Sequence, residues 1–236
     1  TYGRLRTTAI NTSMLLCGSR FGRGWLRPGG ARASMPPSLV ADIRSNLALI
    51  KKDIGIINEH FLAARTVRHR LQGVGALSKE QALELGLVGM AARACGVGID
   101  TRMSLPARPY SQQSIPTVVE GTGDCWARAR IRIREIDASL DWMDTAVQRV
   151  EKLEPSVSDV GPLAPETLAV GVCEGWRGET VHCLETDGTG ALRHYKVQDP
   201  SLRNWFGLAL ALRDNEISDF PICNKSFDLS YCGNDL

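Results

Sequence analysis

Residues 218–235 read Ser-Asp-Phe-Pro-Ile-Cys-Asn-Lys-Ser-Phe-Asp-Leu-Ser-Tyr-Cys-Gly-Asn-Asp, and they are the most informative part of the chain. Ser230 lies two positions after Asp228, and Gly233 lies three positions after Ser230. A serine hydroxyl does not ionise near neutral pH and glycine has no side chain, so neither residue is a soft metal ligand. Cys232 is a thiol, but it stands alone in this tail. The tail therefore predicts no metal site of its own.

The composition is that of an ordinary globular protein. The 236 residues are enough for one sizeable domain with a buried core. Hydrophobic residues make up 43% and charged residues 23%, which excludes a disordered chain. The net charge of +2 is too small to indicate nucleic-acid binding. We interpret the arginine clusters at 20–32 and 128–134 as solvated helix faces or a subunit interface.

Cysteine and histidine usage excludes several classes of site. The seven cysteines are widely spaced and form no Cys-x-x-Cys pair: Cys17, Cys95, Cys125, Cys173, Cys183, Cys223 and Cys232. This spacing argues against a disulfide scaffold, a zinc ribbon and a self-contained iron–sulfur site. The four histidines show no metal-binding spacing either. We therefore expect most cysteines to be small buried side chains in a reducing cytoplasm.

The chain shows neither a membrane span nor a secretory signal. No apolar run approaches the ~20 residues that a transmembrane helix needs. The sequence starts with Thr1 rather than methionine, and it opens inside a helix-like segment, residues 2–16. We therefore expect an N-terminally truncated fragment of a longer protein.

Apolar side chains at steps of three and four predict two long helices. The first follows Pro36-Pro37-Ser38, and its stripe is Val40, Ile43, Leu47, Ile50, Ile54, Ile57 and Phe61. The second starts near Gly123-Asp124 and ends at Pro155, with the stripe Ala129, Ile133, Ile136, Leu140, Met143, Val147 and Val150. Between them, Ser78 and Gln81 have the spacing of a capping box at the start of a short helix.

The last third changes to a strand pattern. Residues 168–174, 180–185 and 191–197 read as strands, and Asp187-Gly188-Thr189-Gly190 is a turn signal between the last two. A short helix is expected at 204–213, followed by an extended tail.

The predicted fold class is mainly α with a small antiparallel β-sheet (α+β). We expect a single domain over residues 1–236. Its helical core would span 1–155, and its β-hairpin region and C-terminal tail would span 165–236.

Four further motifs lie in order along the chain. They are Arg20-Phe21-Gly22-Arg23-Gly24-Trp25-Leu26-Arg27-Pro28-Gly29-Gly30; Gly86-Leu87-Val88-Gly89-Met90-Ala91-Ala92-Arg93-Ala94-Cys95-Gly96-Val97 with Asp100 and Arg102; Gly123-Asp124-Cys125-Trp126-Ala127-Arg128; and Glu174-Gly175-Trp176-Arg177-Gly178-Glu179-Thr180-Val181-His182. The second motif lacks the third glycine and the preceding strand of a dinucleotide loop.

Together with the tail, these motifs resemble the superfamily of nickel–iron hydrogenase large subunits and the hydrogenase-like D subunit of respiratory NADH–quinone oxidoreductase. They are most similar to the large subunit of the formate hydrogenlyase type. In the hydrogenases an Asp-Pro-Cys-x-x-Cys segment holds the bimetallic centre. Asp228 aligns with its aspartate, and Ser230 and Gly233 align with its two cysteines. The resemblance implies a hydrogenase-like helical core that has lost these metal ligands.

The same resemblance implies three site residues. The arginine that matches Arg177 projects over the metal centre in hydrogenases, and the histidine that matches His182 lies close by. By register, Asp228 could orient Arg177 in the vacant cavity. The alternative interpretation of Arg177 is a turn residue paired with Glu174 or Glu179. The alternative interpretation of His182 is a core histidine whose hydrogen bonds are all made within the fold.

The predicted function follows from this resemblance. We expect a hydrogenase-like subunit of a membrane-associated oxidoreductase complex that binds no cofactor itself. It would shape a cavity for quinone or another electron acceptor beside an iron–sulfur small subunit, with further membrane subunits as partners. It would lie on the cytoplasmic side, held there by partners. Two alternatives are an active nickel–iron hydrogenase subunit coupled to formate oxidation and a non-catalytic scaffold.

Overall fold

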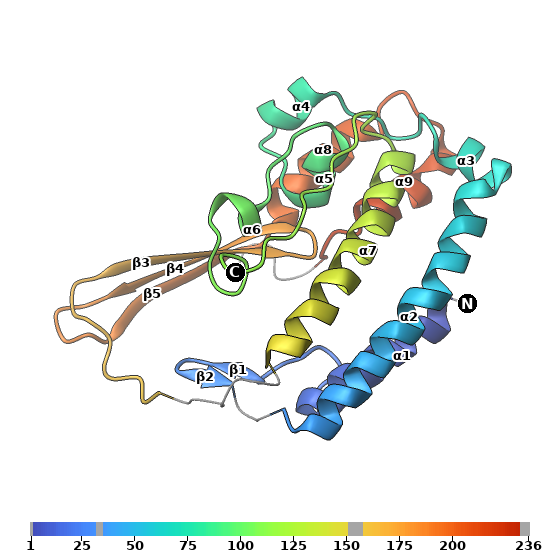
Figure 1. Cartoon of the computed structure of the whole chain (residues 1–236). Coiled ribbons are helices and arrows are strands. Elements are labelled where there is room, and N and C mark those ends of the chain that lie inside the picture. Colours follow the sequence, from blue (N-terminus) through green and yellow to red (C-terminus); the bar gives the residue numbers. More distant parts are fainter. Residues whose placement is uncertain (1, 32–34, 151–157, 232–236) are drawn as a thin grey trace. The chain divides into compact units, whose positions relative to one another are not determined.

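The computed structural model describes residues 2–31, 35–150 and 158–231. The chain divides into two compact units, one of residues 1–64 with 137–162 and one of residues 65–136 with 163–236. Helices dominate, and two small antiparallel sheets complete the described part, which confirms the predicted α+β class (Figure 1). The expectation of a single domain stays a prediction.

The first unit is built on two long helices, α1 (Tyr2–Cys17) and α2 (Pro37–Ala63). They run side by side in opposite directions (Figure 1). The predicted stripe on α2 is buried from Val40 to Ile54, after which Asn58 replaces Ile57 as the buried residue. Tyr2 donates a hydrogen bond of 2.8 Å to Oδ1 of Asn58, so the helix pair is polar at this end.

The same unit contains the Arg-Pro-Gly-Gly segment. It forms a small hairpin of β1 (Leu26–Arg27) and β2 (Gly30–Ala31). At the turn, Gly29 has φ +90°, and a Cβ there would lie 2.1 Å from the backbone oxygen of Ser158. Only glycine fits this combination of a left-handed backbone and a close approach.

The second unit holds most of the buried core. Its helices are α3 (Arg65–Leu71), α4 (Lys79–Glu84), α5 (Gly89–Ala94), α6 (Thr101–Ser104), α8 (Ser201–Ala211) and α9 (Phe220–Phe227), with a 3₁₀ turn at Ile217–Asp219. Helix α7 (Cys125–Val150) contributes its first turns to this unit and the remainder to the other. Ser78 and Gln81 form both hydrogen bonds of the predicted capping box at α4.

Three strands form the antiparallel sheet β3–β4–β5, as predicted. Their bounds are Leu168–Gly175, Gly178–Thr186 and Leu192–Gln198. Gly89 at the start of α5 touches Gly178 at the start of β4, because a Cβ on Gly89 would lie 2.2 Å from the Cα of Gly178. This backbone contact fixes the beginning of β4 on α5.

Three predictions about these elements are wrong in whole or in part. The tail is not extended throughout, since α9 starts at Phe220 and buries Cys223 and Phe227. On α7, Leu140 of the predicted stripe is buried and its other members are half-buried, but the first turns bury Cys125, Ala127, Arg128 and Ile131 instead of Ala129 and Ile133. The arginines at 128–134 do not all lie on a solvated face. Arg128 is fully buried, and its guanidinium donates to the carbonyl of Gly75, which is distant in the sequence. The predicted helix end at Pro155 lies outside the described residues.

Candidate functional site

The predicted Arg177 lies at the tip of the β3–β4 hairpin. Gly175 pairs with Gly178, so Trp176 and Arg177 form a two-residue turn between the strands. Gly178 adopts φ +135°, a conformation that favours glycine. Short turns of this kind fix strand register and side-chain direction, so the hairpin itself positions both side chains.

The predicted Asp228 is the C-terminal cap of α9. It adopts the left-handed conformation, with φ 54° and ψ 45°, and its backbone N–H donates to the carbonyl of Asn224 at 3.1 Å. Such caps end many helices, and aspartate is among the few non-glycine residues that tolerate them. The cap turns both the backbone carbonyl and the carboxylate of Asp228 toward the hairpin tip.

The hairpin tip and this cap are in direct contact. Arg177 Nε donates a hydrogen bond to the backbone carbonyl of Asp228, and Arg177 Nη2 lies 3.7 Å from Asp228 Oδ2. Trp176 Nε1 donates to the same carboxylate oxygen at 3.0 Å. The side chains of Arg177 and Asp228 are 31% and 36% exposed, so a ligand or water can reach the pair.

A second arginine completes this group. The guanidinium carbon of Arg132 lies 5.8 Å from the ring centroid of Trp176, a cation–π distance. Arg132 Nη1 donates to the carbonyl of Arg128 at 3.4 Å, whereas Arg132 Nη2 is buried and has no acceptor in the described part of the chain. Burial lowers the pKa of Arg132 to about 10, against the opposing charge of Asp228. We call Arg132, Trp176, Arg177 and Asp228 the arginine–aspartate cluster.

The structure joins two of the three predicted site residues. Arg177 and Asp228 are in contact, and the alternative pairing of Arg177 with Glu174 is wrong because Glu174 binds Arg93 at 2.8 Å. His182 is on β4, where its Nδ1 lies 2.6 Å from the hydroxyl of Tyr195 on β5. Among the contacts of the described residues, none links His182 to Arg177 or Asp228. The functional roles of all three stay predictions.

Two members of the cluster were missing from the sequence prediction. Trp176 stands where the resemblance expects a different residue, and that departure was the available signal. Arg132 follows Arg128 by one helical turn, a spacing that puts two side chains on one face. Within a run of arginines, this spacing could not distinguish a buried side chain from a solvated one.

The residues aligned with the nickel–iron ligands do not fit that centre. The backbone N–H of Ser230 donates to Ser201 Oγ at 3.0 Å, and its carbonyl accepts from Trp205 Nε1 at 3.1 Å. The position is therefore well held, but a neutral hydroxyl does not replace a soft thiolate. Cys232 and Gly233 lie outside the described residues. Within residues 2–31, 35–150 and 158–231, no group of three or more His, Cys, Asp or Glu side chains could hold a metal ion.

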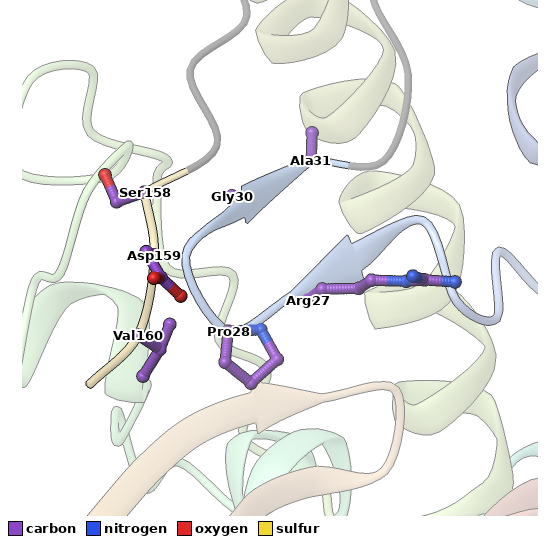
Figure 2. A pocket seen from close by; sticks show the side chains of 7 residues that line it. All are labelled: Arg27, Pro28, Gly30, Ala31, Ser158, Asp159 and Val160. Carbon is purple, nitrogen blue, oxygen red and sulfur yellow. The ribbon is translucent and has the colours of Figure 1, made fainter. Parts of the chain in front are cut away.

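A pocket of about 610 Å³ adjoins the Arg-Pro-Gly-Gly turn in the first unit. Residues 158–160 run beside this turn, and the N–H of Ser158 donates to the Gly29 carbonyl at 2.8 Å (Figure 2). The residues that line the pocket are Arg27, Pro28, Gly30, Ala31, Ser158, Asp159 and Val160. None of the predicted site residues lines it.

Comparison with known proteins identifies the family. Residues 2–163 match the model of the respiratory-chain NADH dehydrogenase 49 kDa subunit. This match covers more than half of the chain, so the protein belongs to that family.

Curated relatives agree with the family match. NADH-quinone oxidoreductase subunit 4 of Thermus thermophilus is 26% identical over 251 residues, covering 95% of this chain and 61% of the relative. The NADH-quinone oxidoreductase D subunit of Wolbachia pipientis is 25% identical, covering 91% and 62%. The C/D subunit of Phocaeicola vulgatus is 29% identical, covering 89% and 41%. The chain thus spans about three fifths or less of these relatives. Among the described residues, no helix is long and apolar enough to cross a membrane.

Proposed function

We propose that this chain is a subunit of a membrane-associated NADH–quinone oxidoreductase-type complex, in which it shapes a cavity for the electron acceptor. The observation that carries the proposal is the contact between the hairpin tip and the helix cap, which joins Arg177 to Asp228. Family membership and the printed names of the relatives supply the class of reaction. The acceptor would be a quinone or a compound of similar chemistry.

The cluster has the chemistry that an acceptor of this kind requires. A quinone gains negative charge on its carbonyl oxygens when it takes up electrons, before protons neutralise that charge. A guanidinium stays protonated even when it is buried, so Arg177 would stabilise the charge as it develops. The Nη2 donor of Arg132, which lacks an acceptor in the described part of the chain, would offer a hydrogen bond to the same ligand.

Asp228 is a positioning residue in this proposal. It holds Arg177 through its backbone carbonyl and Trp176 through its carboxylate. The role of His182 as a further cavity residue rests on the family resemblance, and its Nδ1 lies 2.6 Å from the hydroxyl of Tyr195. Electrons would arrive from an iron–sulfur cluster in a small partner subunit, and membrane subunits would hold the complex on the cytoplasmic side. Ser230 supports an acceptor cavity without nickel, because its hydroxyl does not fit that metal. The particular similarity to formate hydrogenlyase large subunits stays a prediction.

The test uses the complex purified from its native host, with Arg177→Ala compared with the parent. We expect the variant complex to assemble and its quinone reduction rate to fall at least tenfold. Arg193→Ala is the matched control, because Arg193 is an exposed arginine of the same sheet that pairs with Glu185. The control should keep the parental rate.

The other outcomes distinguish the alternatives. If the variant complex reduces quinone at the parental rate, the hypothesis of an acceptor cavity is wrong and the non-catalytic scaffold remains. Elemental analysis of the parent complex should find iron without stoichiometric nickel. One nickel per complex would contradict the metal-free interpretation and restore the hydrogenase alternative.

A further inference from the structure

Arg128 is a fully buried cation in the first turns of α7. Its side chain is 0% exposed and donates to the carbonyl of Gly123 at 2.7 Å, to the carbonyl of Gly75 at 2.9 Å and to Ser226 Oγ at 2.8 Å. The ring of Phe227 lies 4.2 Å from its guanidinium carbon. In the described part of the chain, no carboxylate lies within ion-pair distance of it. Because a buried charge is costly when unpaired, a different anion is expected beside it.

The sulfur atoms of two cysteines lie beside the guanidinium, where an anion is expected. Arg128 Nη2 lies 3.4 Å from the sulfur of Cys125 and 4.0 Å from the sulfur of Cys223. The two cysteines are 1% and 0% exposed. Cys125 comes from the first turn of α7 and Cys223 from α9, so residues almost a hundred positions apart meet at one guanidinium nitrogen.

The surroundings of these thiols are built to hold them together. Ser226 Oγ lies 3.4 Å from the Cys125 sulfur, and its hydroxyl donates to the carbonyl of Cys223 at 2.6 Å. Gly75 leaves the space for the second sulfur, because a Cβ there would lie 2.4 Å from Cys223 Sγ. Cys125, Cys223 and Ser226 with Arg128 thus form a compact site, which shares no side chain with the arginine–aspartate cluster and touches it where Arg132 donates to the Arg128 carbonyl.

The ionisation of Cys125 agrees with this geometry. A hydrogen bond from the Cys223 thiol lowers the pKa of Cys125 to about 6, and the charge of Arg128 and the Ser226 hydroxyl act in the same direction against burial. The same interaction raises the pKa of Cys223. Cys95 lies in the same core, and burial raises its pKa to about 11. These opposite shifts favour the thiolate at Cys125 and the thiol at Cys223, which is the combination that thiol oxidation needs.

We propose that Cys125 and Cys223 are a redox-active dithiol site, which a hydroperoxide oxidises to a disulfide between the first turn of α7 and α9. The Cys125 thiolate attacks the peroxide oxygen and becomes a sulfenic acid, while hydroxide leaves. The Cys223 sulfur then attacks the Cys125 sulfur, the S–S bond forms, and water leaves. In total, two thiols and one hydrogen peroxide give one disulfide and two waters. Burial restricts the oxidant to a small molecule.

The test treats the protein, in its complex, with increasing hydrogen peroxide at pH 7. Remaining thiols are then alkylated under denaturing conditions and the peptides are identified by mass spectrometry. We expect a linked peptide pair containing Cys125 and Cys223, which disappears on reduction with a thiol. Cys95 should remain alkylated at the same peroxide concentration. Full alkylation of both Cys125 and Cys223 at peroxide levels that oxidise exposed thiols would overturn the proposal.

Two variants separate a dithiol from two independent thiols. In Cys223→Ser, Cys125 has no resolving partner, so we expect its sulfenic and sulfinic acids instead of a disulfide. Cys95→Ser is the matched control, since it removes a buried thiol of the same core and should leave the yield of linked peptide unchanged. If Cys95 is found in the link as often as Cys223, the specific pair is refuted.

Discussion

Arg93 and Arg128 are both buried in the second unit, yet they are neutralised in opposite ways. Arg93 is 2% exposed and lies 2.8 Å from both Glu135 and Glu174, with Asp100 at 3.9 Å. Arg128 has carbonyls, a hydroxyl, an aromatic ring and two sulfurs. A permanent cation surrounded by carboxylates stabilises the fold. A cation beside thiols is different, because its counter-charge is a thiolate, which protonation or oxidation can remove.

The first way to test this difference is Arg93→Leu, for which we expect the largest effect. Removal of the guanidinium leaves Glu135 and Glu174 without a cation, whereas Asp100 keeps its pair with Arg102 at 2.6 Å. Breaking a buried ion pair in this way typically destabilises a protein by about 3–5 kcal/mol. The measurement is the free energy of unfolding from denaturant titration. Arg193→Ala breaks an exposed pair at 3.4 Å and should cost about 1 kcal/mol or less. Equal costs for the two variants would show that the Arg93 network is not an anchor.

Arg128→Met is the matching variant for the other arginine, and we expect a smaller loss of about 2 kcal/mol. It removes the Arg128 donor from the Gly75 carbonyl, whereas the Gly123 carbonyl keeps the N–H of Leu77 at 3.2 Å. It leaves no carboxylate without its cation, and Cys125 can take up a proton and become neutral. The absorbance of thiolate, followed against pH, should shift to higher pH in this variant. A loss larger than that of Arg93→Leu would contradict the comparison.

The smallest effect is a pH dependence that comes from Cys125. Its pKa is lowered from 9.0 to about 6 in the folded protein, so between these values the unfolded state binds more protons than the folded state. Its contribution to stability is therefore complete above pH 9 and is lost as the pH falls to 6. Between pH 6 and pH 7, the unfolding free energy of the parent relative to Cys125→Ser should rise by roughly 1 kcal/mol. A difference that does not change with pH would rule out the ion pair with Arg128. Measurements below pH 9 avoid Cys95, whose contribution changes at higher pH.

Local patterns in the sequence predicted the elements that depend on local interactions. The capping box at Ser78 and Gln81 and the three strands involve residues that are close in the chain, and they are confirmed. Helix α9 was not predicted, because this eight-residue helix buries only Cys223 and Phe227, which is too short an apolar pattern to indicate a helix.

The candidate site was only partly predictable, because some of its contacts join residues that are distant in the sequence. Register against a known motif placed Arg177 and Asp228 together, and they are in contact. The burial of Arg128 depends on acceptors at Gly75 and Ser226, which are 53 and 98 positions away. No periodicity within α7 contains that information, so a charged side chain in a helix was assigned to the solvent.

The contact between Gly89 and Gly178 has a consequence for how the cluster can change over evolutionary time. At this point the hairpin that carries Trp176 and Arg177 meets α5 through backbone atoms, and any side chain at either glycine would separate the two elements. The side chains of Trp176 and Arg177 take no part in this backbone contact, so their identity can change while the contact is kept. In a chain with this glycine contact, the side chains at the tip of the hairpin can change during evolution while the position of the tip stays the same.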